Sequence, residues 1–332
     1  DKYAGPYYMR DALHWDLPEE FHHTHWIGER TIANIEQCVE ADQPFFLWAS
    51  FFDPHPPYAV PEPWASMYDP ADVQPGRYRE GEFADMPPHF ARTRETQPDF
   101  SDYAEPGGQD LHGFHSHLHD DAEMRRSIAS YYGMMSLIDA EIGRILDYLD
   151  KAGLAENTLV VFTSDHGHFL GQHGLIAKGP FHYEDVLRVP MIVRYPGCVP
   201  AGETSDALQS LVDYPQTWLA AAGIDAPGVM QGVDQLPVWC GEEAAARDHV
   251  LVENRHNPTT VHLRTLITDR YKITVYRNAK YGELFDLESD PDERCNRWDD
   301  PAYAAVKSEL LLKFVQAEIQ REPTRMPRVA GA

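Results

Sequence analysis

The chain has 332 residues, with 53 acidic against 28 basic side chains, a formal net charge of −25 and 17 histidines. This length predicts about two domains. The hydrophobic share of 43% is enough for a buried core and excludes a mainly disordered chain. The negative charge argues against nucleic acid and anionic membranes as bulk partners, because the mean field repels polyanions. An anionic substrate therefore needs a locally positive pocket built from histidine, lysine, arginine or a metal ion.

The cysteines lie far apart and show no C-x-x-C spacing, which argues against a cysteine zinc site and a dense disulfide framework. They leave the redox compartment and the cellular location open, and we interpret Cys198 as an ordinary thiol. The four positions are Cys38, Cys198, Cys240 and Cys295. No apolar run approaches about 18 residues, so no transmembrane segment is predicted. The N-terminus has neither a starting Met nor a signal-peptide layout, and it resembles the interior of a longer protein.

The first predicted elements are a helix and a strand. Apolar residues at helical spacing predict a helix over residues 28–42. The continuous apolar run from Phe45 to Phe52, which Asp53-Pro54 ends, predicts a buried strand that opens into a loop. Residues 53–121 are rich in Pro, Gly, Asp and His without a sustained period, which predicts a long loop of the kind that is often functional.

A strongly amphipathic helix is predicted over residues 122–152, with Gly153 as its stop. Apolar strands follow at residues 158–162 and 190–195, and a short helix follows at residues 213–222. Helices that alternate with apolar strands predict an α/β fold, in which helices cover both faces of a mostly parallel sheet.

The pattern changes after about residue 235, so we expect an α/β domain at residues 1–235 and a C-terminal α+β subdomain at residues 236–332. Short alternating segments predict a small antiparallel sheet there, followed by a helix. The predicted segments are strands at residues 249–253, 261–268 and 271–276, a turn at Asp269-Arg270, an edge strand at residues 284–287 and a helix at residues 302–320.

Polar side chains gather at the ends of two predicted strands, where ligands collect in open α/β sheets. After the first strand, a proline-rich loop presents His55; a surface turn with an incidental histidine is the alternative. After the second, Asp165 and His166 offer an oxygen and a nitrogen to one cation. A glycine-rich loop then leads to Lys178, whose charge suits an anionic group. The alternative is a loop-capping aspartate and a solvated lysine, but the combination at a strand end favours function.

A second histidine group precedes Asp120-Asp121 and comprises His112, His115, His117 and His119. It is a weaker candidate for a transition-metal site, because its glycine and its loop context favour a solvated segment.

At these residues the sequence resembles the sulfatase family, the formylglycine-dependent sulfuric ester hydrolases of the alkaline-phosphatase-like superfamily. The similar stretches are residues 44–64, 131–197, 211–224 with Gln231-Gly232, and 281–300. The resemblance implies an alkaline-phosphatase-like sandwich with a mostly parallel sheet between helices, and a small C-terminal antiparallel sheet with a helix. It also implies hydrolysis of a sulfate monoester on a small molecule or glycan.

Residue by residue, the resemblance implies that Asp165 and His166 are two ligands of a divalent cation, which is calcium in most members. It implies that Lys178 contacts the sulfate and the bridging oxygen, and that His55 contacts the sulfate and assists the leaving group. His173 is expected in the pocket wall. In the family a hydrated formylglycine attacks sulfur, while the cation and the lysine stabilise negative charge on the equatorial oxygens.

The sequence departs from the family at the nucleophile. It has no Cys-x-Pro-x-Arg type motif, because Gly202 stands where Cys198 would need an arginine, and it lacks the Asp pair that completes the metal shell. We therefore expect an N-terminally truncated sulfatase that alone binds the cation weakly and does not turn over, since calcium takes about six to eight oxygen ligands. The alternatives are a phosphonate or phosphodiester hydrolase of the same superfamily, or a non-catalytic glycan-binding pseudo-sulfatase.

Overall fold

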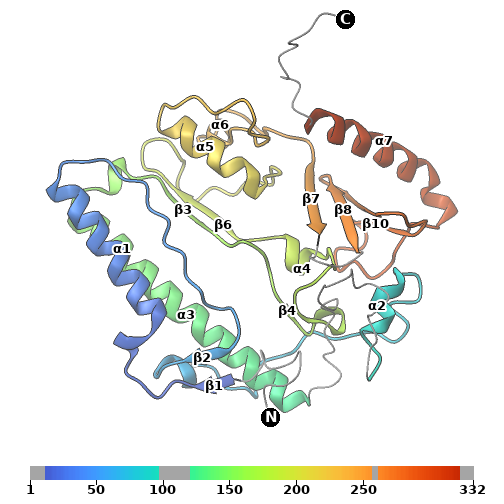
Figure 1. Ribbon diagram of the computed structural model, residues 1–332, viewed down its shortest axis with the longest axis horizontal. Helices are drawn as coiled ribbons and strands as arrows, with labels where there is room; N and C mark the ends of the chain where they lie inside the picture. Colours follow the sequence, from blue (N-terminus) through green and yellow to red (C-terminus); the bar gives the residue numbers. More distant parts are fainter. Residues whose placement is uncertain (1–11, 97–119, 256–260, 322–332) are drawn as a thin grey trace, which may run out of the picture. The chain divides into compact units, whose positions relative to one another are not determined.

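The computed structural model describes residues 12–96, 120–255 and 261–321 (Figure 1). The chain divides into two compact units that interleave along the sequence. Unit 1 comprises residues 1–77, 116–158 and 170–172, and unit 2 comprises residues 78–115, 159–169 and 173–332. The predicted domain boundary after residue 235 stays a prediction. The histidine group at residues 112–119 lies outside the described residues.

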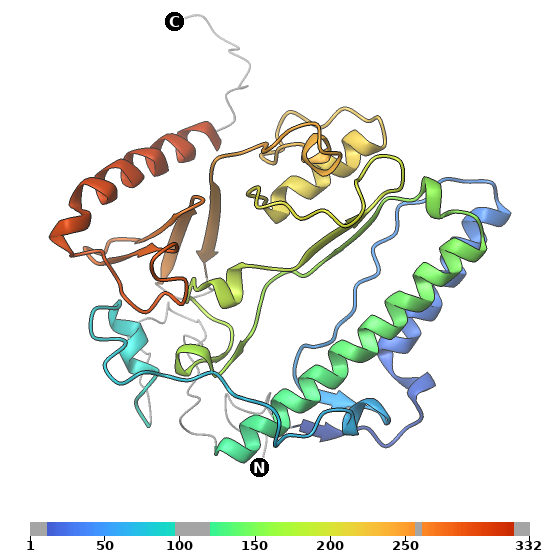
Figure 2. The same ribbon diagram turned by 180° about the vertical axis from the view of Figure 1, so that it is seen from behind.

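Two long helices dominate unit 1. α1 (His23–Glu40) and α3 (Asp121–Lys151) lie side by side (Figures 1 and 2). Gly28 leaves room for the Glu141 side chain between them, since a Cβ at that position would lie 2.0 Å from Glu141 Oε2. Both predicted helices are confirmed. α1 starts earlier than residue 28 because the His22 side chain accepts a hydrogen bond from the amide of Thr24 and caps the helix.

α3 has a clear start and stop in the sequence. A capping box of Asp120 and Glu123 satisfies the first amides of the helix. The chain leaves the helix through Gly153, whose φ of +71° suits glycine. These local signals explain why the sequence predicts the bounds of α3 closely.

The rest of unit 1 packs against α3. The short strands β1 (Ala12–His14) and β2 (Tyr58–Val60) pair in parallel. The described residues of this unit also form three 3-10 turns, η1 (Glu19–Phe21), η2 (Trp64–Ser66) and η5 (Ala155–Asn157). Two clusters of buried apolar side chains lie among the described residues of this unit, one of Tyr58, Val60, Met134 and Leu137, and one of Val73, Ile128 and Ala129.

The predicted strand at Phe45–Phe52 is wrong for the described structure. This segment belongs to no sheet of the described residues, and the side chains of Phe46 and Trp48 are 67% and 68% exposed. A strand is held by a ladder to a neighbour, and an apolar run cannot supply that neighbour by itself. The exposure still alternates along the segment, since Phe45 and Leu47 are half-buried.

In unit 2, the two strands expected in the parallel sheet pair with each other. β3 (Val160–Thr163) runs antiparallel to β6 (Met191–Arg194), with Val161 opposite Val193. All four residues of β3 are only half-buried, and Ile192 is exposed. The described residues therefore do not form the predicted, mostly parallel sheet. Among them, the short strands β1 and β2 of unit 1 do pair in parallel.

The C-terminal part of unit 2 follows the prediction. Four antiparallel strands lie in the order β10-β9-β8-β7, and α7 packs along this sheet through Leu310, Phe314 and Ala317 (Figure 1). Their bounds are β7 Val250–Arg255, β8 His262–Ile267, β9 Tyr271–Tyr276, β10 Gly282–Asp286 and α7 Ala304–Arg321. The predicted turn at Asp269-Arg270 joins β8 to β9, closed by a hydrogen bond from the Thr268 amide to the Tyr271 carbonyl.

The predicted helix at residues 213–222 is confirmed as α5. It is one of several shorter elements among the described residues. These elements are α2 Pro88–Arg92, β4 Phe169–Leu170, η6 Gln172–Gly174, β5 Ile176–Ala177, α4 Glu184–Leu187, η7 Leu211–Asp213, α5 Tyr214–Ala221, α6 Leu236–Trp239 and η8 Pro301–Tyr303. None of the described helices is both long and apolar enough to cross a membrane.

Cys198 is not an ordinary thiol, because it forms a disulfide with Cys240 in unit 2. The two Cα atoms lie 5.0 Å apart, within the usual range for a disulfide. The two positions are 42 apart in the sequence, and sequence spacing alone does not define which cysteines pair.

The C-terminal sheet buries charged groups as well as apolar ones. Glu283 on β10 accepts a hydrogen bond from the Tyr276 hydroxyl, and burial raises the pKa of Glu283 to about 7. Lys272 on β9 is fully buried and is paired with Glu293 and Glu184. These groups are paired as buried charges must be.

Candidate functional site

Three predicted site residues come together just beyond the end of β3. The Lys178 Nζ lies 2.8 Å from His166 Nε2, and His166 Nε2 lies 3.4 Å from Asp165 Oδ2. Asp165 and His166 follow β3 directly, and the glycine-rich loop returns Lys178 to them. The carboxylate of Asp165 is 82% exposed, so this group faces solvent on one side.

The turn after β3 is made by Gly167. Its amide donates to the carbonyl of Val186 over 2.7 Å, and a Cβ at this position would lie 2.0 Å from the carbonyl oxygen of Asp185. Only glycine allows this approach of two backbones. The Ser164 hydroxyl also donates to the His166 carbonyl over 3.0 Å. The segment that carries Asp165 and His166 is thus held by hydrogen bonds on both sides.

The hydrogen bonds of His166 assign its tautomer. Nδ1 lies 2.8 Å from the backbone carbonyl oxygen of Gly167, which can only accept, so Nδ1 carries the proton. The lone pair of Nε2 then points to Lys178, whose ammonium donates to it. An imidazole oriented in this way, with its other nitrogen on a carbonyl, is the usual form of a metal-ligating histidine.

Lys178 has an unusual electrostatic environment for a lysine. Partial burial lowers the pKa of Lys178 below the usual lysine value, and the nearby carboxylate of Asp165 opposes that shift. A half-buried ammonium is poorly hydrated and gains more than a solvated one from an anionic partner. Lys178 can therefore bind an oxyanion group with a charge-assisted hydrogen bond.

Asp165 and His166 fit two neighbouring positions of a divalent cation. Metal–oxygen bonds of about 2.3–2.6 Å at a right angle separate two ligand atoms by about 3.3–3.7 Å, and the observed separation is 3.4 Å. Further oxygen ligands are needed, because calcium takes about six to eight. The lone pair of His166 Nε2 cannot serve a cation and the ammonium of Lys178 at once.

His173 is buried in unit 2, and both its ring nitrogens contact carboxylates. Nδ1 lies 2.5 Å from Glu82 Oε1, Nε2 lies 3.5 Å from Asp185 Oδ2, and the ring stacks on Tyr183. Burial alone would lower the pKa of His173, but the bonds to Asp185 and Glu82 outweigh it and the net shift is upward. His173 therefore holds the loop between β4 and β5 to its surroundings, and contact with a substrate stays a prediction.

His55 lies in unit 1, on the loop before β2. Its Nδ1 lies 2.7 Å from the carbonyl oxygen of Pro56, which leaves Nε2 as the nitrogen available to a ligand. The ring lies beside that of Phe52, with centroids 5.0 Å apart. His55 belongs to a different unit from Lys178, and its part in the same site stays a prediction.

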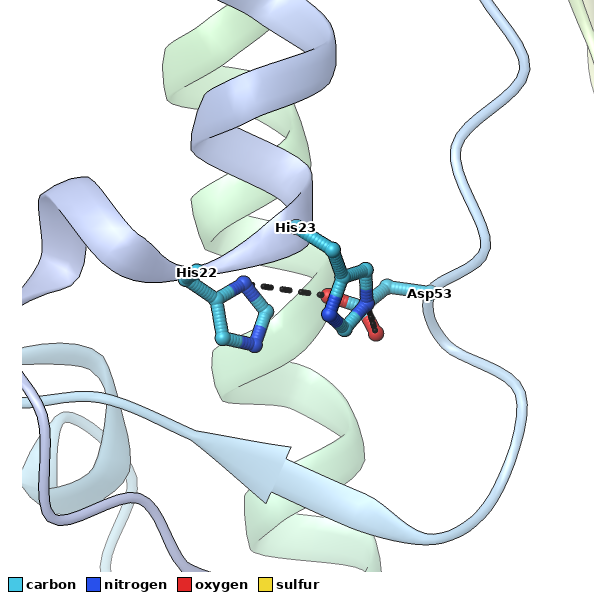
Figure 3. Close-up of side chains that lie close together, drawn as sticks. All are labelled: His22, His23 and Asp53. Atoms are coloured by element: carbon cyan, nitrogen blue, oxygen red, sulfur yellow. Dashed lines mark hydrogen bonds and ion pairs between the residues drawn. The ribbon is translucent and has the colours of Figure 1, made fainter.

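The loop that carries His55 is held to the start of α1 on both sides of that residue. Before it, buried Asp53 accepts a hydrogen bond of 2.5 Å from the Thr24 hydroxyl, and His23 Nε2 lies 2.8 Å from its other oxygen (Figure 3). After it, the His22 Nε2 donates to the carbonyl of Ala59 over 3.0 Å. Burial lowers the pKa of His22, while Asp53 opposes that shift.

Sequence reasoning missed this group of contacts to Asp53. The only signal is the adjacent pair His22-His23, and nothing in the spacing connects it to an aspartate 30 residues later. A second missed group contains Glu19, His25 and Glu141, whose ligand-type atoms lie within 4.8 Å of one another. There the Arg144 guanidinium already bonds both oxygens of Glu141.

Comparison with known proteins identifies the family. The Sulfatase family model matches residues 3–224, and that of the N-sulphoglucosamine sulphohydrolase C-terminal region matches residues 171–320. The chain is 29% identical over 297 residues to an uncharacterized sulfatase, YidJ, of Escherichia coli, which covers 89% of this chain and 55% of that protein. It is 35% identical over 197 residues to an N-acetylglucosamine-6-O-sulfatase of Bacteroides thetaiotaomicron, covering 57% of this chain and 35% of that protein.

A solved structure agrees with these matches. The phosphonate monoester hydrolase of Agrobacterium radiobacter superposes with a TM-score of 0.77 at 25% identity, covering 94% of this chain and 64% of that one. The chain thus spans 55% or less of the two curated relatives compared above. This similarity confirms the alkaline-phosphatase-like fold class. Since the Sulfatase model matches more than half of its residues, the chain belongs to the sulfatase family of the alkaline-phosphatase-like superfamily.

Proposed function

We propose that this protein is a sulfuric ester hydrolase that acts on a sulfate monoester of a glycan or small molecule. The observation that carries the proposal is the convergence of Asp165 Oδ2, His166 Nε2 and Lys178 Nζ beyond β3. This group offers an ammonium and, once Lys178 leaves His166 Nε2 for an anionic partner, two metal-type ligand atoms at one place. In a chain with a net charge of −25, it is a local site at which an anionic ester can bind.

In this proposal, Lys178 binds a sulfate oxygen and compensates the negative charge that grows there in the transition state. Asp165 and His166 would hold a divalent cation, calcium by family resemblance, which supplies a Lewis acid for the sulfate oxygens when bound. His55 would give a proton to the leaving alcohol through Nε2, since Nδ1 is bonded to the Pro56 carbonyl.

The nucleophile of the proposed mechanism is a formylglycine made from a cysteine or serine. Cys198 cannot supply it, because its sulfur is bonded to Cys240 and the following residues lack the required arginine. We therefore assign the nucleophile to a Cys-x-Pro-x-Arg type motif that is not among these 332 residues. Residues 1–332 alone are accordingly expected to bind sulfate esters without hydrolysing them.

The names of the relatives support the proposed substrate class. One is named an N-acetylglucosamine-6-O-sulfatase, which makes a sulfated amino sugar the first substrate to test. The similarity to a phosphonate monoester hydrolase supports a second candidate, a phosphonate or phosphodiester hydrolase, because Lys178 and a divalent cation also suit phosphoryl oxygens. The third alternative is a glycan-binding protein without turnover.

The test uses the protein expressed from its complete gene. Rates are measured on 4-nitrophenyl sulfate, N-acetylglucosamine 6-sulfate and bis-4-nitrophenyl phosphate, with and without a calcium chelator. Faster hydrolysis of the sulfate esters supports the proposal, and a preference for the phosphodiester contradicts it. Binding of the sulfated sugar without any hydrolysis favours the glycan-binding alternative.

A further inference from the structure

The start of α1 and the loop before β2 bring two imidazoles and a carboxylate together. Figure 3 shows His22 and His23 at the first turn of α1, with their rings directed toward Asp53 on the facing loop. The three ligand-type atoms all lie within 4.8 Å of one another. His22 and Asp53 are buried, whereas the His23 side chain is 38% exposed.

The spacing of the three groups suits a small tetrahedral ion. Zinc bonds of about 2.0–2.1 Å place two ligand atoms of a tetrahedron about 3.3 Å apart. His23 Nε2 lies 2.8 Å from Asp53 Oδ1, and His22 Nδ1 lies 3.8 Å from Asp53 Oδ2. These two distances, to the two oxygens of one carboxylate, lie on either side of the tetrahedral value, so small shifts of the side chains let one oxygen and both imidazoles bind a single ion.

The surrounding hydrogen bonds orient the groups as a metal site requires. His22 Nε2 donates to the Ala59 carbonyl, so its Nδ1, which lies 3.8 Å from Asp53 Oδ2, carries a lone pair; without an ion this lone pair accepts from the Thr24 amide. The carboxylate of Asp53 is held by the Thr24 hydroxyl. Outer hydrogen bonds of this kind, from a backbone carbonyl and a hydroxyl, fix the ligands of most protein metal sites.

We propose that His22, His23 and Asp53 form a binding site for a first-row transition-metal ion, for which Zn²⁺ is the probe. Two imidazoles and one carboxylate favour zinc over calcium or magnesium, which prefer oxygen ligands. The exposed side of His23 leaves the fourth position to water. This site is separate in sequence and composition from Asp165 and His166, and it does not depend on the proposed hydrolase activity.

Binding has two identifiable consequences for the local structure. His22 Nδ1 must give up the 3.3 Å hydrogen bond from the Thr24 amide, which opposes binding. His23 must carry its proton on Nδ1, so that Nε2 binds the ion in place of donating to Asp53. A bound ion then links α1 to the loop of His55, which is two residues beyond Asp53.

The group of Glu19, His25 and Glu141 provides the matched comparison. It also offers three ligand-type atoms, but the Arg144 guanidinium contacts Glu141 at 2.7 Å and His25 at 3.2 Å. A positive charge thus already occupies that position. A dication is repelled there, so His25→Ala serves as a control on the same helix.

The experiment is calorimetric titration of metal-stripped protein with ZnCl₂ in excess calcium, for the wild type, His23→Ala and His25→Ala. We expect His23→Ala to weaken the affinity for one zinc ion per chain at least about tenfold. His25→Ala should leave this affinity unchanged. His23 is partly exposed, so its substitution is compatible with folding, which circular dichroism checks. Cobalt substitution gives a second measurement, because the visible absorption of tetrahedral Co²⁺ reports the ligands directly.

Loss of the zinc equivalent and of the cobalt absorption in His23→Ala alone supports the site. The proposal is overturned if the wild type and His23→Ala bind zinc equally well. It is also overturned if excess calcium displaces the bound zinc. Asp53→Asn is the second variant, because it keeps the size of the side chain. If folded Asp53→Asn binds zinc as tightly as the wild type, the proposal is likewise wrong.

Discussion

Replacement of Lys178 by alanine removes the ammonium of the proposed site and tests its contribution to catalysis. A hydrogen bond from a charged donor contributes about 1.5–3 kcal/mol, and each 1.36 kcal/mol changes a rate tenfold. We therefore expect kcat/KM for 4-nitrophenyl sulfate to fall by about 10- to 150-fold in the protein expressed from its complete gene.

The pH profile gives this prediction a second readout. Because partial burial lowers the pKa of Lys178, its charge is lost at a lower pH than that of a solvated lysine. The wild-type kcat/KM should accordingly decline on the alkaline side before the ordinary lysine range. Lys178→Arg should retain activity to higher pH, since arginine stays protonated.

The matched control is Lys151→Ala, which removes an exposed lysine that lies 3.5 Å from Asp147 on the surface of α3. This variant should keep the wild-type rate, because exposed ion pairs contribute little. An unchanged kcat/KM in Lys178→Ala, or an equal loss in Lys151→Ala, would refute the assignment of Lys178 to the site.

Three further predictions concern stability and are measured by urea unfolding of residues 1–332. Thr24→Val should lower the free energy of unfolding of unit 1 by about 1.5–3 kcal/mol, because buried Asp53 loses a hydrogen bond to its charge; unchanged stability would show that Thr24 does not hold the loop. The pKa of Glu283 is raised from 4.5 to about 7, so ionisation of this buried carboxyl destabilises the fold as the pH rises through that range. Glu283→Gln should therefore be more stable than the wild type by about 3 kcal/mol at pH 8 and equally stable below pH 4.5. A stability difference that does not vary with pH would contradict this. Replacement of Cys198 and Cys240 by serine should cost up to about 4 kcal/mol, the chain-entropy value for a 42-residue loop, and a reducing agent should then affect the wild type alone.

Elements with local signals were predictable from the sequence. α3 has its capping box at Asp120 and its stop at Gly153, and the turn at Asp269-Arg270 defines the β8–β9 hairpin. Such features depend on residues within a few positions of one another. The alternation of helices and apolar strands predicts the α/β class, and family resemblance predicts the alkaline-phosphatase-like fold, which structural similarity confirms.

Features that depend on distant partners were not predictable. The apolar run at Phe45–Phe52 resembles a buried strand, but whether it joins a sheet depends on a neighbour that the run does not contain. β3 and β6 were likewise expected in a parallel sheet, yet they pair antiparallel within the described residues. Hydrophobic periodicity predicts which residues of one segment are buried, but it does not predict the direction in which two strands pair.

In the candidate site, too, contacts between residues close in the sequence were predictable and contacts between distant residues were not. Asp165, His166 and Lys178 meet because one short glycine-rich loop connects them, so the sequence could place them together. The contacts that hold Asp53 come from Thr24 and His23, which are 29 and 30 residues away in the sequence. No local pattern predicts such contacts, because tertiary packing alone creates them.

The proposed function assigns the hydrolysis of sulfate esters to the group at Asp165, His166 and Lys178. The most direct measurement compares kcat/KM for 4-nitrophenyl sulfate and bis-4-nitrophenyl phosphate in the protein expressed from its complete gene, with Asp165→Ala alongside. We expect a higher value for the sulfate monoester and its loss in Asp165→Ala. A higher value for the phosphodiester, or full sulfatase activity without the Asp165 carboxylate, would contradict it.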